Sequence, residues 1–147
     1  QQKRVLDYIE VGKQEGARLV LGGSRPAHLD RGWYVEPTLF ADVRNDMRIA
    51  QEEIFGPVLV VIPFDSIDEA IAIANDSDYG LSGAVYAKDR ALAESIARRV
   101  RTGQISINGY AMCVVQPFGG YKQSGLGREG GVEGFDAFFE TKLIQEF

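Results

Sequence analysis

The sequence is poor in the residues that form covalent and metal-bound cross-links. Its 147 residues include one cysteine, Cys113, and one histidine, His28. A single cysteine excludes an internal disulfide and is typical of a reducing compartment, so we expect a cytoplasmic protein. No cluster of cysteine, histidine or acidic residues has the spacing of a metal site, so no metal is expected.

Long apolar runs and an excess of positive charge are also missing. The longest apolar run, Val58 to Ile62, is far too short to cross a bilayer. The formal net charge is -5, from 16 Lys and Arg against 21 Asp and Glu. This balance argues against a nucleic-acid surface, which needs clustered positive charge. We therefore expect neither a membrane nor a nucleic acid among the partners.

The first residues already follow a helical pattern. Val5, Leu6, Tyr8 and Ile9 lie on one helical face, and no capping residue precedes them. The pattern starts at Gln1 without a methionine. We expect from this that the chain is cut from a longer protein, and a frayed terminal helix is the alternative.

Strand and helix patterns alternate in the middle of the chain. Val58 to Phe64, Leu81 to Ala87 and Gln104 to Asn108 are predicted strands, with helical periodicity between them and Asp89 placed to cap the second helix. This order predicts an α/β fold with a parallel β-α-β-α-β core and right-handed crossovers. Pro37 is expected to keep its own extended stretch away from a sheet centre.

Three parallel strands and two helices make an incomplete unit. A parallel sheet needs both faces covered and usually has more strands. The missing elements must come from an absent N-terminal part or from a partner chain. Until they do, we expect an exposed apolar patch larger than is normal for a monomer.

The stretch from Gln51 to Val58 places two carboxylates before an aromatic residue and a Gly-Pro turn. Ligands of open α/β sheets bind where strands meet such loops. A carboxylate there can accept hydrogen bonds from ribose hydroxyls, and an aromatic ring two residues later can lie against a nicotinamide ring. Spacing alone favours the other interpretation, a surface acid pair and a core phenylalanine.

Six of the fifteen residues from Pro117 to Gly131 are glycine. Gly125 to Gly130 has the letters of the dinucleotide fingerprint Gly-x-Gly-x-x-Gly. The fingerprint also needs a strand that leads directly into it and a complete β-α-β unit after it, and both are missing here. We interpret the stretch as an ordered loop beside a site, leading into a helix near Gly131 to Ala137.

Cys113 is the obvious candidate nucleophile, yet its surroundings are unfavourable. A catalytic thiol needs a base or another group that lowers its pKa. The only histidine, His28, is remote in sequence and is expected to be solvated in a loop. Met112 and Val114 make the neighbourhood apolar. A buried or pocket-lining thiol is therefore favoured over a nucleophile.

Several motifs together resemble the aldehyde dehydrogenase superfamily. They are QEEIFGPVL (51–59), YGLSGAVY (79–86), ISIN (105–108), PFGGYKQSGLGREGG (117–131) and FFETKLI (138–144). They occur in the family's order and cover essentially the whole chain. The resemblance implies an incomplete C-terminal part of a catalytic domain in residues 1–137. Residues 138–147 would be an oligomerisation strand that joins a neighbouring subunit's sheet.

The resemblance also implies oxidation of an aldehyde to a carboxylic acid with NAD or NADP. In that family a cysteine thiolate adds to the aldehyde, hydride passes to the nicotinamide, and a glutamate activates water. Nucleophile, base and dinucleotide-binding domain lie upstream of Gln1, so no catalytic residue is expected in this chain. The complete enzyme would be a homodimer or homotetramer.

Carried over position by position, the resemblance assigns two groups of site residues. The cofactor contacts would be Glu53 on the nicotinamide ribose, Phe55 on the nicotinamide ring, and Gln1 and Arg4 near the ribose. The substrate-pocket residues would be Phe118 in the wall and Tyr110, Met112 and Cys113 along the entrance. The alternative function is a non-catalytic truncated paralogue that acts as a binding or assembly module.

Overall fold

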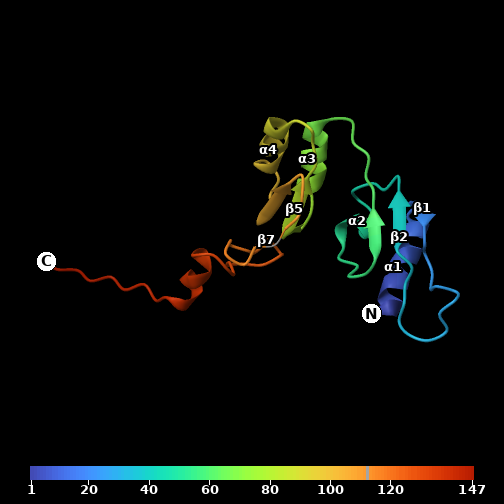
Figure 1. The fold of residues 1–147 in the computed structure, drawn as a ribbon, viewed down its shortest axis with the longest axis horizontal. Coiled ribbons are helices and arrows are strands. Elements are labelled where there is room, and N and C mark those ends of the chain that lie inside the picture. Colours follow the sequence, from blue (N-terminus) through green and yellow to red (C-terminus); the bar gives the residue numbers. More distant parts are fainter. Residues whose placement is uncertain (112) are drawn as a thin grey trace. The chain divides into compact units, whose positions relative to one another are not determined.

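The computed structural model of the protein describes residues 1–111 and 113–147. These residues form two compact units, Gln1–Ser66 and Ile67–Phe147. Figure 1 shows the helices and strands of both units, coloured along the chain. In the described part of the chain, no helix is both long enough and apolar enough to cross a membrane.

The first unit is built on a three-stranded sheet. It begins with helix α1 (Gln2–Gln14), followed by strand β1 (Arg18–Leu21), strand β2 (Thr38–Ala41), the short helix α2 (Arg48–Gln51) and strand β3 (Val58–Val60). The strand order is β1-β2-β3. Strands β1 and β2 are antiparallel, whereas β2 and β3 are parallel.

One face of this sheet is packed against α1 and α2. Val5 and Ile9, one turn apart on α1, are buried beside Phe40 of β2 and Ile49 of α2. Gly12 continues the same helical face, and a Cβ atom there would lie 2.9 Å from Ile49 Cδ1 and 3.1 Å from Phe40 Cζ. Glycine thus lets α1 approach the sheet closely enough to bury Phe40 completely.

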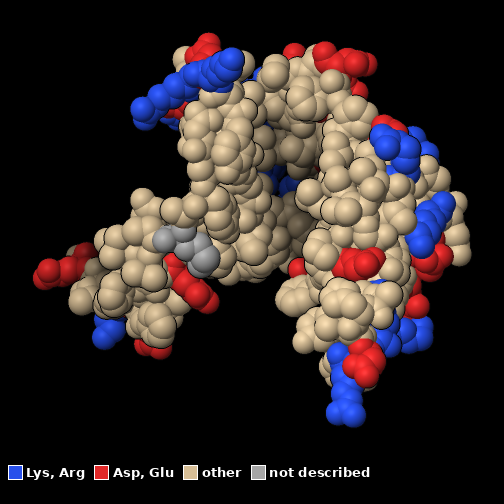
Figure 2. All heavy atoms as spheres, turned by 45° about the vertical axis from the view of Figure 1, so that its right-hand side comes forward, with Lys and Arg blue, Asp and Glu red and all other residues tan. Residues whose placement is uncertain are grey.

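The opposite face of the sheet carries a row of leucines. Leu21, Leu39 and Leu59 are aligned across the three strands by the strand register. Leu21 is 60% exposed and Leu59 is 64% exposed, and all three line one shallow groove with Pro37 and Pro57. Figure 2 shows the Lys, Arg, Asp and Glu side chains of one view, with broad areas between them that carry none. Large apolar side chains therefore remain uncovered here.

The second unit contains two small sheets. Its elements are α3 (Ile67–Asn75), β4 (Tyr79–Gly80), β5 (Ser82–Val85), α4 (Arg90–Ala97), β6 (Gln104–Ile107), β7 (Tyr121–Lys122) and the 3₁₀-helix η1 (Glu133–Phe138). Strands β5 and β6 pair in parallel, with α4 as the crossover between them. Strands β4 and β7 pair antiparallel.

The start of α4 follows the sequence expectation. Asp89 is the N-cap, and its side chain accepts hydrogen bonds from the backbone N–H groups of Ala91 and Leu92. These are two of the N–H groups that a helix start leaves without a backbone partner. The β5-α4-β6 part of the predicted core is confirmed.

Two sequence expectations about the sheets are wrong in detail. Val58–Val60 pairs with β2 in a separate sheet and not with β5. The stretch after Pro37 is β2, the central strand of its sheet. Pro37 does not prevent this, because β2 begins only at Thr38. Thr38 N–H makes the first hydrogen bond of this strand, to the Pro57 carbonyl at 2.8 Å, so Pro37 lies just outside the ladder. A proline at this position removes no ladder hydrogen bond.

The chain after η1 has no strand pairing within the described residues. Phe139 is extended, and residues 139–147 are exposed. The red end of the ribbon in Figure 1 follows this segment. A strand needs a hydrogen-bonded neighbour, so the expected oligomerisation strand of 138–147 stays a prediction.

Candidate functional site

The candidate cofactor segment begins where α2 ends. Glu52 is the C-cap of α2 and has an extended backbone, so the chain leaves the helix at this residue. Ile54 is buried in the core of the first unit, whereas Glu53 and Phe55 on either side of it are exposed. Alternation about a buried isoleucine directs the acid and the ring to solvent.

The first turn of α1 holds the backbone of this segment. Gln1 Nε2 donates to the carbonyl oxygens of Ile54 at 3.2 Å and Phe55 at 2.7 Å. Arg4 Nη2 donates to the carbonyl oxygen of Glu53 at 2.6 Å. The structure thus brings together all four residues expected near the cofactor, and it shows that Gln1 and Arg4 bind backbone oxygens of the segment.

Phe55 has a backbone conformation that bulky residues rarely adopt. Its φ is +59°, in the left-handed region that costs an L-residue about 1–2 kcal/mol. Its side chain is 76% exposed, so burial of the ring does not offset this strain. Gly56 follows in close contact with Val5, where any side chain would clash. Strained backbone of this kind clusters at functional sites, which makes the segment a candidate site.

The two adjacent glutamates have different environments. The Glu52 carboxylate is bound by Arg48 through two hydrogen bonds, Nε to Oε1 at 2.8 Å and Nη2 to Oε2 at 2.9 Å. The Tyr8 hydroxyl donates to Oε2 at 2.7 Å. Glu53, in contrast, has no hydrogen bond or ion pair through its carboxylate within 1–111 and 113–147. Only Glu53 can offer both oxygens to a ligand.

Hydrogen bonds to the charged form lower a carboxyl pKa. The bonds from Arg48, and next the bond from Tyr8, lower the pKa of Glu52 to about 2. The same contact with Glu52 raises the pKa of the Tyr8 hydroxyl and that of the Arg48 guanidinium. Sequence analysis missed this triad, because Tyr8 comes from α1 and lies 44 positions from Glu52.

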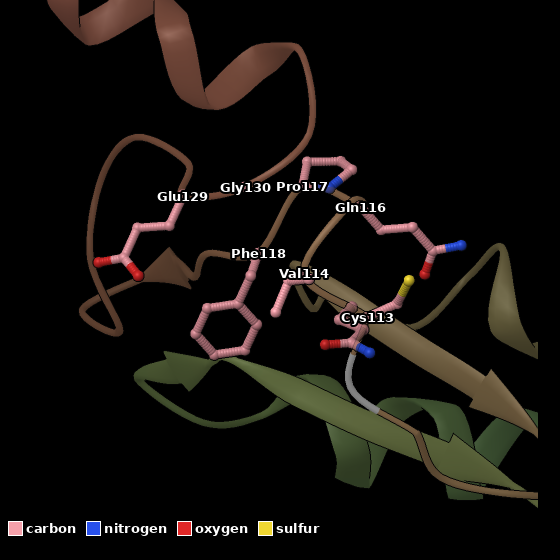
Figure 3. Close-up of a pocket in the computed structure, with 8 residues that line it drawn as sticks. Cys113, Val114, Gln116, Pro117, Phe118, Glu129 and Gly130 are labelled. Atoms are coloured by element: carbon pink, nitrogen blue, oxygen red, sulfur yellow. The ribbon is translucent and has the colours of Figure 1, made fainter.

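The second unit contains a cavity of about 200 Å³ beside the glycine-rich loop. Phe118 and Cys113 both line it, and Figure 3 shows the ring and the thiol at the same cavity. Gln104 of β6 and Glu129 also line it. Sequence analysis predicts neither as a site residue, because Gln104 fits a strand and Glu129 lies in the glycine-rich loop. Two of the expected pocket residues thus come together.

The other two expected pocket residues do not join this group. Tyr110 is 58% exposed and is not among the residues that line the cavity. Met112 lies outside the described residues. Cys113 is exposed at the surface of the cavity, so it is a pocket-lining thiol and is not buried. Within the described residues, no three His, Cys, Asp or Glu side chains are grouped as metal ligands.

The loop that carries Phe118 is held by backbone pairing and by its own Arg128 and Lys122 side chains. Phe118 and Glu129 exchange two backbone hydrogen bonds of 2.7 Å. Arg128 Nη1 donates to the Gly120 carbonyl at 3.0 Å, and its guanidinium lies 5.5 Å from the centre of the Tyr121 ring. Lys122 Nζ donates to the carbonyls of Asn75 and Ser77 at 2.8 Å each, where α3 ends. These contacts fix the Phe118 side of the cavity.

The fold and site define an α/β chain with a free carboxylate beside an exposed ring in one unit and a partly apolar cavity in the other. Comparison with known proteins gives this class a family. The aldehyde dehydrogenase family model matches residues 1–144, and the chain belongs to that family.

Curated relatives are similar over nearly the whole chain. A geranial dehydrogenase of Castellaniella defragrans is 55% identical over 137 residues, which are 93% of this chain and 28% of the relative. A betaine aldehyde dehydrogenase of Rhizobium johnstonii is 49% identical over 146 residues, 98% of this chain and 30% of the relative. The chain therefore spans less than a third of the length of these relatives.

Solved structures agree with the fold. The aldehyde dehydrogenase of Mycobacterium tuberculosis in complex with NAD+ has a TM-score of 0.91 and 56% identity, over 93% of this chain and 28% of that chain. A cysteine-to-alanine mutant of aldehyde dehydrogenase C of Pseudomonas syringae, in complex with NAD+ and octanal, has a TM-score of 0.93 and 51% identity, over 96% of this chain and 29% of that chain.

Proposed function

We propose that this chain is the part of an NAD(P)-dependent aldehyde dehydrogenase that contacts the nicotinamide riboside and walls the aldehyde pocket. The observation that carries the proposal is the Glu53–Phe55 segment. It offers an unpartnered carboxylate, within the described residues, and an exposed ring on a backbone held by α1. The bound nicotinamide would accept hydride from the substrate.

The roles of the two side chains follow from their chemistry. The Glu53 carboxylate has two free oxygens, and a carboxylate can accept one hydrogen bond from each of two neighbouring ribose hydroxyls. The exposed face of Phe55 can lie against a flat, partly cationic ring. Gln1 and Arg4 bind only the backbone of the segment. They therefore orient Glu53 and Phe55 while leaving the Glu53 and Phe55 side chains available to a ligand.

The cavity beside Phe118 is proposed as one side of the aldehyde pocket. A complete small-molecule pocket has a volume of roughly 300–1,000 Å³ and mostly apolar walls. The cavity here has about 200 Å³, with Val114, Pro117 and Phe118 as apolar lining. The remaining walls would come from outside this chain. Cys113 would then contact substrate as a wall residue, and the nucleophile would lie elsewhere in the complete enzyme.

The test uses a fusion enzyme, in which the part of the Pseudomonas syringae relative that precedes its match to Gln1, with the mutated cysteine restored, is joined to this chain. NAD+ and octanal serve as probes. The fusion enzyme is expected to oxidise octanal. A fusion enzyme that folds cooperatively yet neither binds NAD+ nor oxidises octanal contradicts the proposal.

Glu53→Gln in the fusion enzyme tests the cofactor contact. A hydrogen bond to a charged group contributes about 1.5–3 kcal/mol. The combined loss, in NAD+ affinity multiplied by the single-turnover rate of hydride transfer, should therefore be roughly ten- to a hundredfold. Glu94→Gln is the matched control, because Glu94 is an exposed glutamate of α4 in the other unit, paired with Arg98. Unchanged single-turnover kinetics in Glu53→Gln would remove the ribose assignment.

The second candidate, a non-catalytic binding or assembly module, rests on the short share of each relative that the chain covers. Isothermal titration of the purified 147-residue chain with NAD+ separates the two functions. The enzyme-part proposal expects no measurable binding, since one carboxylate and one ring cannot hold a whole dinucleotide. Binding in the micromolar range favours the module.

A further inference from the structure

We propose that Glu52 is a positioning residue for the nicotinamide contacts. With Arg48 and Tyr8 it fixes the backbone that presents Glu53 and Phe55. This inference rests on the proposed function, because it concerns how those two contacts are held. Glu52 would touch neither cofactor nor substrate and would act through its neighbour.

Glu52 is engaged by two different elements. Arg48 reaches it from one turn earlier on α2, and Tyr8 reaches it from α1. Two cations lie over the Tyr8 ring, with the guanidinium carbon of Arg4 at 5.3 Å and that of Arg48 at 5.8 Å from its centre. These cations therefore help to hold the Tyr8 hydroxyl at Glu52.

The segment after Glu52 has no side-chain anchor of its own at the two exposed positions. Arg4 and Gln1 bind only carbonyl oxygens of Glu53, Ile54 and Phe55. Phe55 is in the left-handed region, so the backbone needs external support to stay there. Glu52 supplies a side-chain anchor at the start of the segment, next to the residue that must present its carboxylate.

Charge gives Glu52 a second part in the arrangement. Two guanidinium groups, Arg4 and Arg48, lie beside Tyr8 close to the segment. Glu52 neutralises Arg48 with a bidentate pair. Without it, the Arg48 guanidinium would need another carboxylate, and the candidates are Glu15, which already accepts from the Arg48 backbone N–H, and the neighbouring Glu53. One glutamate thus keeps the other available.

A double-mutant cycle in the fusion enzyme tests the inference. The variants are Glu52→Ala, Glu53→Gln and both together, with Tyr8→Phe and Glu52→Gln as milder changes that preserve shape. Coupling within a hydrogen-bonded network predicts that Glu52→Ala raises the KM for NAD+ by roughly three- to thirtyfold. The KM for octanal should stay the same. The double variant should lose less than the two single losses combined, because Glu52 then has only the Phe55 contact left to position.

The control for Glu52→Ala is Glu94→Ala, which removes an exposed Glu–Arg pair of the same i,i+4 spacing from α4. Glu52→Gln, which can still accept from Arg48 and Tyr8, should recover part of the loss. Effects that simply add, or a Glu52→Ala variant that behaves like Glu94→Ala, overturn the positioning role. If Glu53→Gln has no effect, the proposed function fails instead, whatever Glu52 does.

Discussion

The Tyr8 hydroxyl donates a 2.7 Å hydrogen bond to Oε2 of Glu52, across 44 positions of the sequence. This contact joins the middle of α1 to the residue that ends α2. It leaves Glu53, the next residue, with its carboxylate outside the network. The glutamate pair is therefore divided between two tasks, one structural and one facing solvent.

The Glu52 contacts predict an acid-dependent loss of stability. Its pKa in the folded chain is about 2, below the ordinary 4.5, so the unfolded chain binds this proton more readily. The stabilisation is complete above about pH 4.5 and is lost as the pH falls towards 2. In urea unfolding, wild type should be more stable than Glu52→Gln at pH 6, and the difference should shrink between pH 4.5 and 2.

Carboxyl-carbon NMR gives the direct measurement of that pKa. Tyr8→Phe removes one of the donors, so the midpoint of Glu52 should move up towards the ordinary value. A Glu52 midpoint that is the same in wild type and Tyr8→Phe would show that the hydroxyl does not stabilise the carboxylate.

Replacement of Phe55 by glycine should separate stability from function. The left-handed backbone costs an L-residue about 1–2 kcal/mol, while glycine loses about 0.5–1 kcal/mol through the entropy of the unfolded chain. The ring is 76% exposed, so little burial is lost. Phe55→Gly should raise the free energy of unfolding slightly and weaken NAD+ binding in the fusion enzyme. Lower stability of this variant in urea would contradict the strain argument.

The buried hydroxyl of Thr38 should matter more than its methyl group. Thr38 Oγ1 accepts from Gly23 N–H at 3.0 Å and donates to the Glu36 carbonyl at 2.8 Å, and the residue is buried. Thr38→Val keeps the shape but leaves the Gly23 N–H without this acceptor, which should cost about 1–3 kcal/mol. Thr38→Ser keeps the hydroxyl and is the control. Equal thermal midpoints for wild type and Thr38→Val would exclude this role.

The sequence predicted elements better than their pairing. The capping chemistry of Asp89 and the hydrophobic periodicity of the neighbouring residues predicted α4 and the parallel β5-α4-β6 unit. The partner of Val58–Val60 did not, because a short β-branched run pairs equally well with any neighbouring strand. Propensity alone predicts that Pro37 lies off the sheet centre, whereas a strand that begins at Thr38 is unaffected by the proline before it.

The candidate site divides in the same way. The motif around Glu53 and Phe55 could be found through family resemblance, and the structure places Gln1 and Arg4 against its backbone. Spacing alone put Phe55 in a core, because nothing local predicts a left-handed phenylalanine. The Tyr8–Glu52 contact depends on the packing of α1 against α2, so no local pattern contains it.

Gly12 offers a test of that packing. A helix gains up to about 1 kcal/mol when glycine becomes alanine, but the new Cβ would lie 2.9 Å and 3.2 Å from two carbons of Ile49 and 3.1 Å from Phe40. Overpacking of a close-packed core costs about 1–3 kcal/mol, so the clash should outweigh the propensity gain. Gly12→Ala should therefore lower the unfolding free energy in urea, and Gly12→Val should lower it further.

Lys13→Ala, at an exposed position of the same helix, is the control and should change little. If Gly12→Ala proved more stable than wild type, α1 would have to lie farther from Phe40 than the structure shows, and the anchoring of the Glu53 segment by α1 would lose its basis.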